Sequence, residues 1–187
     1  MPALSNVIGF DDGPFEKRGP ARDVLLVGAV FARTRLDGVV AGRVRRDGRN
    51  ATDRMIELIR GSQFDRHVRA VVLGGIAVAG FNVVDIHRLA HALERPVLVV
   101  ARRQPRMAKL RLALFHVRGA EAKWRLIERA GPMEALDNLY VQRAGLSLEQ
   151  ARTLLRATTL HGVLPEPLRV AHLIAGGITT GHSRGRA

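Results

Sequence analysis

Residues 23–50, DVLLVGAVFARTRLDGVVAGRVRRDGRN, decide the fold class that this chain can adopt. Residues 24–31 form an almost uninterrupted apolar run, which predicts a buried β-strand. Residues 36–50 alternate enough to predict a partner strand, with Asp37-Gly38 as one turn and Asp47-Gly48 as the turn that ends it. Because only a short polar connection separates the two strands, we expect them to pair antiparallel.

A shorter apolar run precedes this pair, in the stretch IGFDDGPF at residues 8–15. Residues 7–10 predict a first strand, so that the chain would begin with a three-stranded antiparallel meander. Two adjacent carboxylates, Asp11 and Asp12, follow that strand directly. Since successive side chains point to opposite sides of a strand, one acid can face a site at the strand end while the other orients the turn.

Beyond the meander, the spacing of apolar residues changes to that of helices and buried strands. Residues 51–62 and 82–93 have helical spacing, whereas residues 68–75 and 95–101 are continuous apolar strands. After Arg102 the chain is expected to be mainly helical. The order predicts an α/β mixed sheet: an antiparallel meander, then strands joined by crossover helices, with a helical C-terminal part.

The composition predicts a globular protein that binds a polyanion. The 187 residues contain 30 Lys and Arg against 17 Asp and Glu, a formal net charge of +13. A field of this sign attracts nucleic acid, the commonest polyanion. A GC-rich genome would explain why most of the basic residues are arginines rather than lysines. It would not explain why basic residues outnumber acidic ones.

The totals also limit the location and the number of domains. The chain has no cysteine, no apolar run near the roughly 20 residues that cross a bilayer, and no secretory signal at its start. We therefore expect a cytoplasmic protein with no membrane partner. A length of 187 residues predicts a single domain over residues 1–187.

Three further segments carry residue types that can bind phosphate or metal. PEPLRVAH, residues 165–172, places Arg169 and His172 on one helix face, where they could assist metal binding, proton transfer or phosphate contact. The glycine-punctuated loop at residues 75–82 could offer backbone donors to a phosphate or a base edge. No acid interrupts residues 95–118, whose cations form a strip that could contact phosphates.

Each of these segments also has a structural interpretation. Asp-Asp-Gly-Pro is a common turn, the histidine could be satisfied by backbone groups, and the glycines could merely permit tight turning. The cationic strip could be a solvated helix face. His87 and His91 lie four apart, but no third zinc ligand accompanies them.

Taken together, IGFDDGPF, GGIAVAGFNVVDI and LPEPLRVAHLIAGGI resemble the deoxyuridine endonuclease family, which is distantly similar to endonuclease V. The resemblance covers nearly the whole chain, including NATDRMIELI, WRLIERAG and LYVQRAG. It implies a ribonuclease-H-like fold in a single endonuclease-V-like domain. In such folds a central-strand aspartate, here Asp11, binds Mg²⁺ or Mn²⁺, which polarises the phosphate and activates a water.

The same resemblance implies roles for other residues. Asp12 would be a second metal ligand or an orienting group, and His172 an auxiliary catalytic group near the metal. The loop that contains Gly75, Gly80 and Asn82 would hold an extruded deaminated base. Independently of the resemblance, the cationic strip and the PEPLRVAH helix give Arg102, Arg103 and Arg169 as the expected phosphate contacts.

Three departures from the endonuclease V pattern affect the expected site. Asn50 stands where an acid is expected, with Asp53 one turn onward as a possible substitute. Gly74 stands where the fourth strand would carry another acid. The aromatic wedge that separates strands in endonuclease V has no visible counterpart.

Three functions follow from these observations. The first is a metal-dependent endonuclease acting in DNA repair on deaminated bases such as deoxyuridine, with Asp11, Asp53 and His172 as catalytic candidates. The second is a nucleic-acid-binding protein that keeps a nuclease-like fold without the full set of acids. The third, a small-molecule phosphohydrolase, would need a closed pocket in place of an open basic groove.

Overall fold

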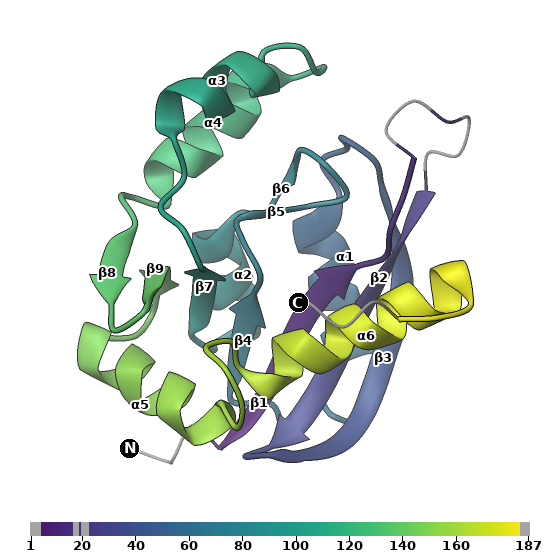
Figure 1. The fold of residues 1–187 in the computed structure, drawn as a ribbon, viewed down its shortest axis with the longest axis vertical. Helices are drawn as coiled ribbons and strands as arrows, with labels where there is room; N and C mark the ends of the chain where they lie inside the picture. Colours follow the sequence, from purple (N-terminus) through teal and green to yellow (C-terminus); the bar gives the residue numbers. More distant parts are fainter. Residues whose placement is uncertain (1–4, 17–18, 20–22, 184–187) are drawn as a thin grey trace.

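A mixed seven-stranded sheet runs through the molecule in this computed structural model, which describes residues 5–16, 19 and 23–183. β1 (Asn6–Asp12), β2 (Asp23–Ala32) and β3 (Arg35–Arg45) form an antiparallel meander. β4 (Ala70–Leu73) and β7 (Val97–Ala101) continue the sheet parallel to β1 (Figure 1). The predicted α/β mixed sheet, with its meander followed by parallel strands, is confirmed.

The turn between β2 and β3 lies earlier than the sequence predicts. β2 ends at Ala32 and β3 begins at Arg35, so the turn contains Arg33, which has a positive φ of 57°. Asp37-Gly38 lies inside β3. A Cβ at Gly38 would lie 2.1 Å from Cζ of Phe64, so this glycine makes room for an aromatic ring rather than for a turn. The turn prediction was wrong because an Asp-Gly pair serves either purpose.

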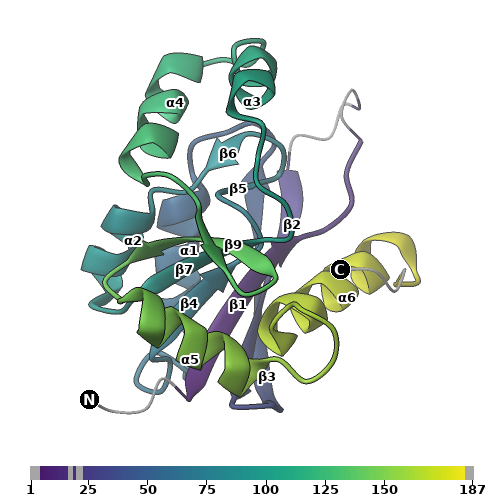
Figure 2. The same ribbon diagram turned by 60° about the vertical axis from the view of Figure 1, so that its left-hand side comes forward.

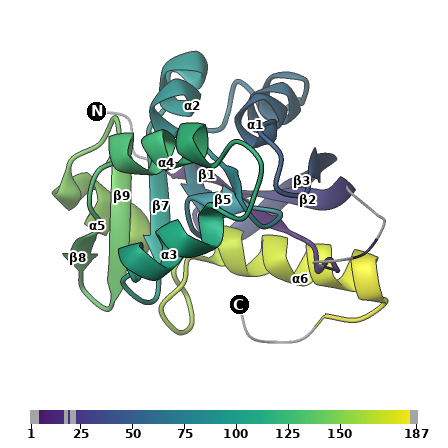
Figure 3. The same ribbon diagram turned by 90° about the horizontal axis from the view of Figure 1, so that it is seen from above.

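Helices cover both faces of the sheet (Figures 2 and 3). α1 (Ala51–Arg60) and α2 (Ile86–Leu93) pack on one face, in a core that includes Phe10 and Met55. α5 (Leu148–Thr158) and α6 (Glu166–Thr180) pack on the other, where Leu168 joins a second core. Alternation along β1 therefore decides which helix pair each of its side chains meets.

A glycine lets α6 approach β1 closely. A Cβ at Gly9 would lie 2.5 Å from the carbonyl carbon of Pro167 and 2.7 Å from the backbone nitrogen of Leu168. Only a residue without a side chain can occupy that position while the helix start lies directly on the strand. The first turn of α6 is thereby held against the centre of the sheet.

A small hairpin and a helix pair extend beyond the carboxyl ends of β4 and β7 (Figure 1). The hairpin consists of β5 (Ala77–Val78) and β6 (Asn82–Val83). The helix pair consists of α3 (Met107–Leu114) and α4 (Ala120–Arg129). The helix predicted from residue 82 begins only at Ile86, because the hairpin takes the residues before it.

The C-terminal part contains strands that the sequence analysis missed. β8 (Glu134–Leu136) and β9 (Leu139–Ala144) form a hairpin, and β9 pairs antiparallel with β7. The expectation of a mainly helical segment after Arg102 was therefore incomplete. The available signal was the Asp137-Asn138 turn between two short apolar runs.

No helix in the described part of the chain is long and apolar enough to span a bilayer.

Candidate active site

The carboxyl ends of three parallel neighbours define one edge of the sheet. β1, β4 and β7 lie side by side in the order β1-β4-β7, with Phe10 beside Leu73 and Leu73 beside Val99. Adjacent strands are ~4.8 Å apart, so the ends of β1 and β7 are separated by about 10 Å. In α/β sheets this edge is where ligands bind, outside the carboxyl ends of the strands.

Asp11 meets His172 at this edge. Nδ1 of His172 lies 2.8 Å from Oδ2 of Asp11, and the two residues are 161 positions apart. With Asp11 ionised, the Nδ1–H group donates to the carboxylate. Burial raises the pKa of the Asp11 carboxyl above its ordinary value, and the hydrogen bond and charge of His172 offset only part of that rise.

Asp12 points away from Asp11, toward the β5–β6 hairpin. Its Oδ2 accepts a hydrogen bond from the backbone N–H of Ala79 at 3.0 Å. Burial, and then the negative charge of Asp11, raise the pKa of Asp12 to about 6. The two neighbouring acids thus contact opposite sides of the strand, as the alternation of side chains predicts.

A carboxylate at the end of β1 fits a hard cation, although the ligand set on either side of the strand is small. Asp11 and Asp12 are each partly buried, and among the described ion pairs only His172 offsets the charge of Asp11. Residues 5–16, 19 and 23–183 contain no group of three or more His, Cys, Asp or Glu arranged to hold a metal. Mg²⁺ is usually bound through one or two carboxylates plus substrate phosphates, and Asp11 beside His172 supplies one such carboxylate, whereas Asp12 faces the other side of the strand.

The structure places Asp53 on the face of the sheet opposite His172. Asp53 lies on α1 and pairs with Arg88 of α2, on the sheet face opposite α6. The substitute role predicted for Asp53 fails geometrically, because its helix packs on the wrong face to reach His172.

The two positions where acids were expected have other structural functions. Oδ1 of Asn50 accepts hydrogen bonds from the backbone N–H of Arg45 and from Nδ2 of Asn82. A Cβ at Gly74 would meet only Cδ2 of Leu168, at 4.0 Å, so this position is open. Neither position supplies a carboxylate to the site.

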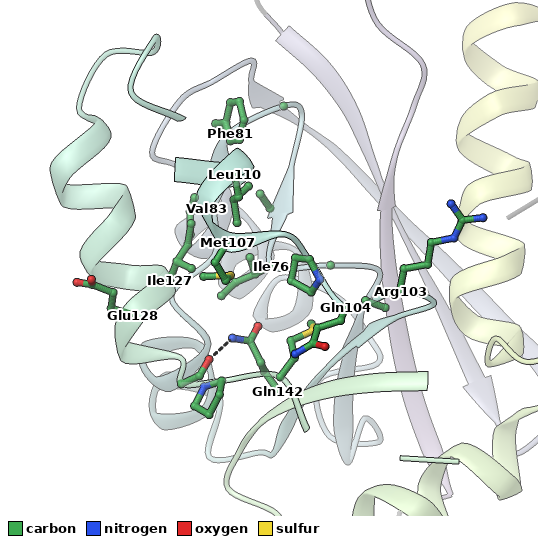
Figure 4. Close-up of a pocket in the computed structure, with 18 residues that line it drawn as sticks. Ile76, Phe81, Val83, Arg103, Gln104, Met107, Leu110, Ile127, Glu128 and Gln142 are labelled. Carbon is green, nitrogen blue, oxygen red and sulfur yellow. Dashed lines mark hydrogen bonds between the residues drawn. The ribbon is translucent and has the colours of Figure 1, made fainter. Parts of the chain in front are cut away.

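An apolar cavity of about 530 Å³ lies at the same edge, between the β5–β6 hairpin and the segments that flank α3 and α4 (Figure 4). Gly75 and Gly80 lie on its wall, and their contact with a base stays a prediction. Asn82 does not lie on the wall: it is fully buried, donates to the carbonyl of Arg45 and accepts from the N–H of Ala51. The prediction that Asn82 contacts nucleic acid was wrong, because its amide closes the turn between β3 and α1.

The three predicted arginines have different surroundings. Arg102 and Arg103 are exposed in the connection from β7 to α3, and the Arg103 side chain points away from the cavity (Figure 4). Arg169 donates from Nε and Nη2 to the buried carboxylate of Glu166, which raises the pKa of the arginine. Arg169 therefore fixes the first turn of α6 in addition to any contact it makes with a phosphate.

Part of the cavity wall comes from residues that the sequence analysis did not select. Gly131, Met133 and Gln142 belong to the connection after α4 and to β9. The one available signal was a glutamine inside the short apolar strand LYVQRA. Gln142 belongs to the cavity wall because β9 pairs with β7, and local sequence does not reveal that pairing.

Comparison with known proteins gives a family and a fold. The family model described as Endonuclease dU matches residues 4–179. A UPF0215 protein of Deinococcus radiodurans is 55% identical over 188 residues, which cover 99% of this chain and 94% of the relative. The crystal structure of a protein of unknown function from Archaeoglobus fulgidus superposes with a TM-score of 0.88 at 34% identity, over 94% of this chain and 99% of that chain.

A more distant likeness concerns the fold alone. The structure of Ciona intestinalis endonuclease V, in complex with a 24mer DNA containing an inosine followed by a ribo-adenosine, has a TM-score of 0.57 at 14% identity. The match covers 89% of this chain and 82% of that one. The expected ribonuclease-H-like, endonuclease-V-like fold is therefore confirmed.

Proposed function

Because the chain belongs to the endonuclease dU family, we propose that it is a metal-dependent endonuclease that cleaves DNA containing deaminated bases, with deoxyuridine as the first candidate. The observation that carries the proposal is the pairing of Asp11 with His172 at the carboxyl end of a central strand. An apolar cavity lies at the same edge of the sheet. Together these features offer a place for a phosphate and a place for its base.

Each site residue has a role in this proposal. Asp11 is the principal ligand of Mg²⁺ or Mn²⁺, and Asp12 is a second ligand or holds the strand end against the backbone of Ala79. When bound, the cation polarises a phosphate and lowers the pKa of a water. His172 orients the Asp11 carboxylate through Nδ1 and keeps Nε2 for a proton at the reacting phosphate.

The cavity is proposed to hold the extruded base. Its wall at Ala101 lies about 10 Å from the end of β1, a span comparable with the reach of one nucleotide. Extrusion costs a few kcal/mol, and least at a mispaired base, which favours deaminated positions. The inosine-containing DNA crystallised with the endonuclease V of Ciona intestinalis supports a substrate of this class.

The charge supports DNA as the polymer. The net charge of +13 and the exposed Arg102 and Arg103 beside the cavity suit a phosphate backbone. The mostly apolar wall of the cavity disfavours a small phosphate ester, which would need charged partners inside it. This argues against the phosphohydrolase alternative.

The proposal is tested by cleavage of labelled duplex DNA that contains one uracil or one hypoxanthine, with Mg²⁺ or Mn²⁺ present. We expect nicking near the lesion, loss of nicking in EDTA, and a rate at least about 100-fold lower in Asp11→Asn. Asp53→Asn is the matched control, since it removes one exposed carboxylate, paired with Arg88 on the sheet face opposite His172, and should nick at the wild-type rate.

A nucleic-acid-binding protein without nuclease activity is the second candidate. It is favoured by Gly74 and Asn50, which leave the described residues without a three-donor metal group. Tight, salt-sensitive binding by the wild type with no nicking under any metal would contradict the nuclease and support this candidate.

A further inference from the structure

Gln142 is the buried polar side chain of the cavity wall. It is 5% exposed, and its Nε2 donates to the carbonyl of Gly131 at 2.6 Å. A carbonyl only accepts hydrogen bonds, so this contact determines which end of the amide carries the nitrogen. Oε1 is therefore on the other side, and Figure 4 shows it directed into the cavity.

The Oε1 atom has no hydrogen-bond partner among the residues that the structure describes. The atom is accessible from the cavity, since it is not among the described side-chain atoms that are both buried and without a partner, so a ligand in the cavity can donate to it. The remaining polar side chains on the wall, Arg103, Gln104 and Glu128, are exposed. The fixed polar feature in the depth of the cavity is thus an acceptor surrounded by apolar groups.

An acceptor at this place distinguishes a deaminated base from the amino-bearing base from which it forms. The ring nitrogen beside the amino-bearing carbon is an acceptor in cytosine (N3) and adenine (N1). Deamination turns the amino group into a carbonyl, and the same nitrogen then carries a hydrogen in uracil and hypoxanthine. An acceptor facing that edge bonds the deaminated base and is left facing another lone pair in the parent base.

We propose that Oε1 of Gln142 reads the ring N–H that deamination creates, and that Gln142 is the residue by which the cavity selects uracil or hypoxanthine over cytosine or adenine. This inference rests on the proposed function of the cavity as a base pocket. Gly131 contributes by holding the amide in the accepting orientation. Selection by one such bond is worth roughly 10- to 100-fold.

The opposing interpretation is that Gln142 only ties the connection after α4 to β9. In that case its loss would lower stability and affect every base alike. The test must therefore separate an effect on one base edge from an effect on the whole pocket.

The experiment uses three duplexes that differ only at one position, which carries deoxyuridine, N3-methyl-deoxyuridine or deoxycytidine. An abasic site stands opposite in each, so that base pairing does not contribute. Binding is measured in EDTA by competition, and nicking is measured with Mn²⁺. Wild type is compared with Gln142→Met and with Gln104→Met, the same chemical change at an exposed position of the same wall.

We expect the wild type and Gln104→Met to prefer deoxyuridine over both other probes by about 10- to 100-fold, and Gln142→Met to treat all three about equally. A preference for deoxyuridine that survives in Gln142→Met would overturn the inference. The same holds if the wild type treats deoxyuridine and its N3-methyl form alike, a comparison that needs no variant to fold. Absence of nicking on every duplex would instead overturn the proposed function, while the binding measurement still decides the role of Gln142.

Discussion

The two acids at the end of β1 combine a local and a long-range role. Oδ1 of Asp11 accepts from the backbone N–H of Asp12 at 3.0 Å, which is the local bond expected of a simple Asp-Asp turn. The other oxygens reach His172 and Ala79, which are distant in sequence. A turn alone would not bury two carboxylates, so the cost of their desolvation indicates a function beyond turning.

Gly74 offers a gain-of-function test at the scale of one residue. Its open Cβ direction points toward Leu168, on the same sheet face as Asp11 and His172. Gly74→Asp would add a carboxylate beside Asp11 without a steric clash. Because ligand charge sets much of the affinity for a hard cation, we expect Mn²⁺ to bind about tenfold more tightly, as measured by calorimetry.

The control for this change is the double variant Gly74→Asp with Asp11→Asn, which restores the number of carboxylates to that of the wild type. It should lose the gain in affinity. Unchanged Mn²⁺ affinity in the single variant would show that position 74 does not face the metal site.

At the scale of elements, the contact between β1 and α6 positions His172. Gly9 meets the backbone at Pro167 and Leu168, and His172 follows about one turn later on the same helix. The geometry of α6 then places His172 beside Asp11 at the end of β1. The position of the site therefore depends on a glycine two residues before Asp11.

We expect Gly9→Ala to destabilise the protein by about 1–3 kcal/mol, because a methyl group would overlap backbone atoms that cannot rotate away. Urea denaturation measures the loss. Nicking should fall further than the folded fraction does, since α6 moves away from Asp11.

Gly177→Ala is the matched control on α6 itself. A Cβ there meets nothing within 4 Å, so alanine should stabilise the helix by up to about 1 kcal/mol and leave nicking unchanged. Equal stability changes in the two variants would contradict the close approach described for Gly9.

At the scale of the whole molecule, positive charge gathers beyond the carboxyl edge of the sheet. Five cationic side chains in the β7–α3 connection and α3 are exposed, and they are Arg102, Arg103, Arg106, Lys109 and Arg111. Elsewhere many acids pair with arginines, as Asp65 does with Arg95 and Glu134 with Arg143. Part of the surplus of positive charge therefore lies on the same side as the cavity and Asp11.

Binding to DNA should consequently depend on salt through this edge. For Arg102→Ala with Arg103→Ala, we expect the slope of log K against log salt to decrease in magnitude by about two, roughly one per lost phosphate contact. Fluorescence anisotropy over a salt series measures it, and affinity should fall for lesion and normal DNA alike.

The matched control removes two exposed arginines, Arg66 and Arg69, from the connection that precedes β4, at the other end of the sheet. That variant should keep the wild-type slope. If both variants reduce the slope equally, the charge acts as a diffuse field rather than as a binding edge.

Local sequence was enough to predict the meander, the two parallel strands after it, and the placement of acids at the end of β1. These features follow from local periodicity, because a buried strand needs an apolar run and a half-buried helix needs an apolar stripe. The shared face of Arg169 and His172 follows in the same way from helix geometry. The family resemblance added Asp11 as the residue to which His172 is joined.

The contacts between these elements could not be predicted, because they depend on long-range packing. The tertiary structure paired β9 with β7 and so placed Gln142 in the cavity wall, it put Asp53 on the far face of the sheet, and it enclosed Asn82 behind the β3–α1 turn. Each outcome depends on contacts between residues more than 30 positions apart, such as the bond from Arg88 to Asp53. Periodicity reports which face of an element is buried, but the partner on that face is chosen by packing of the whole chain.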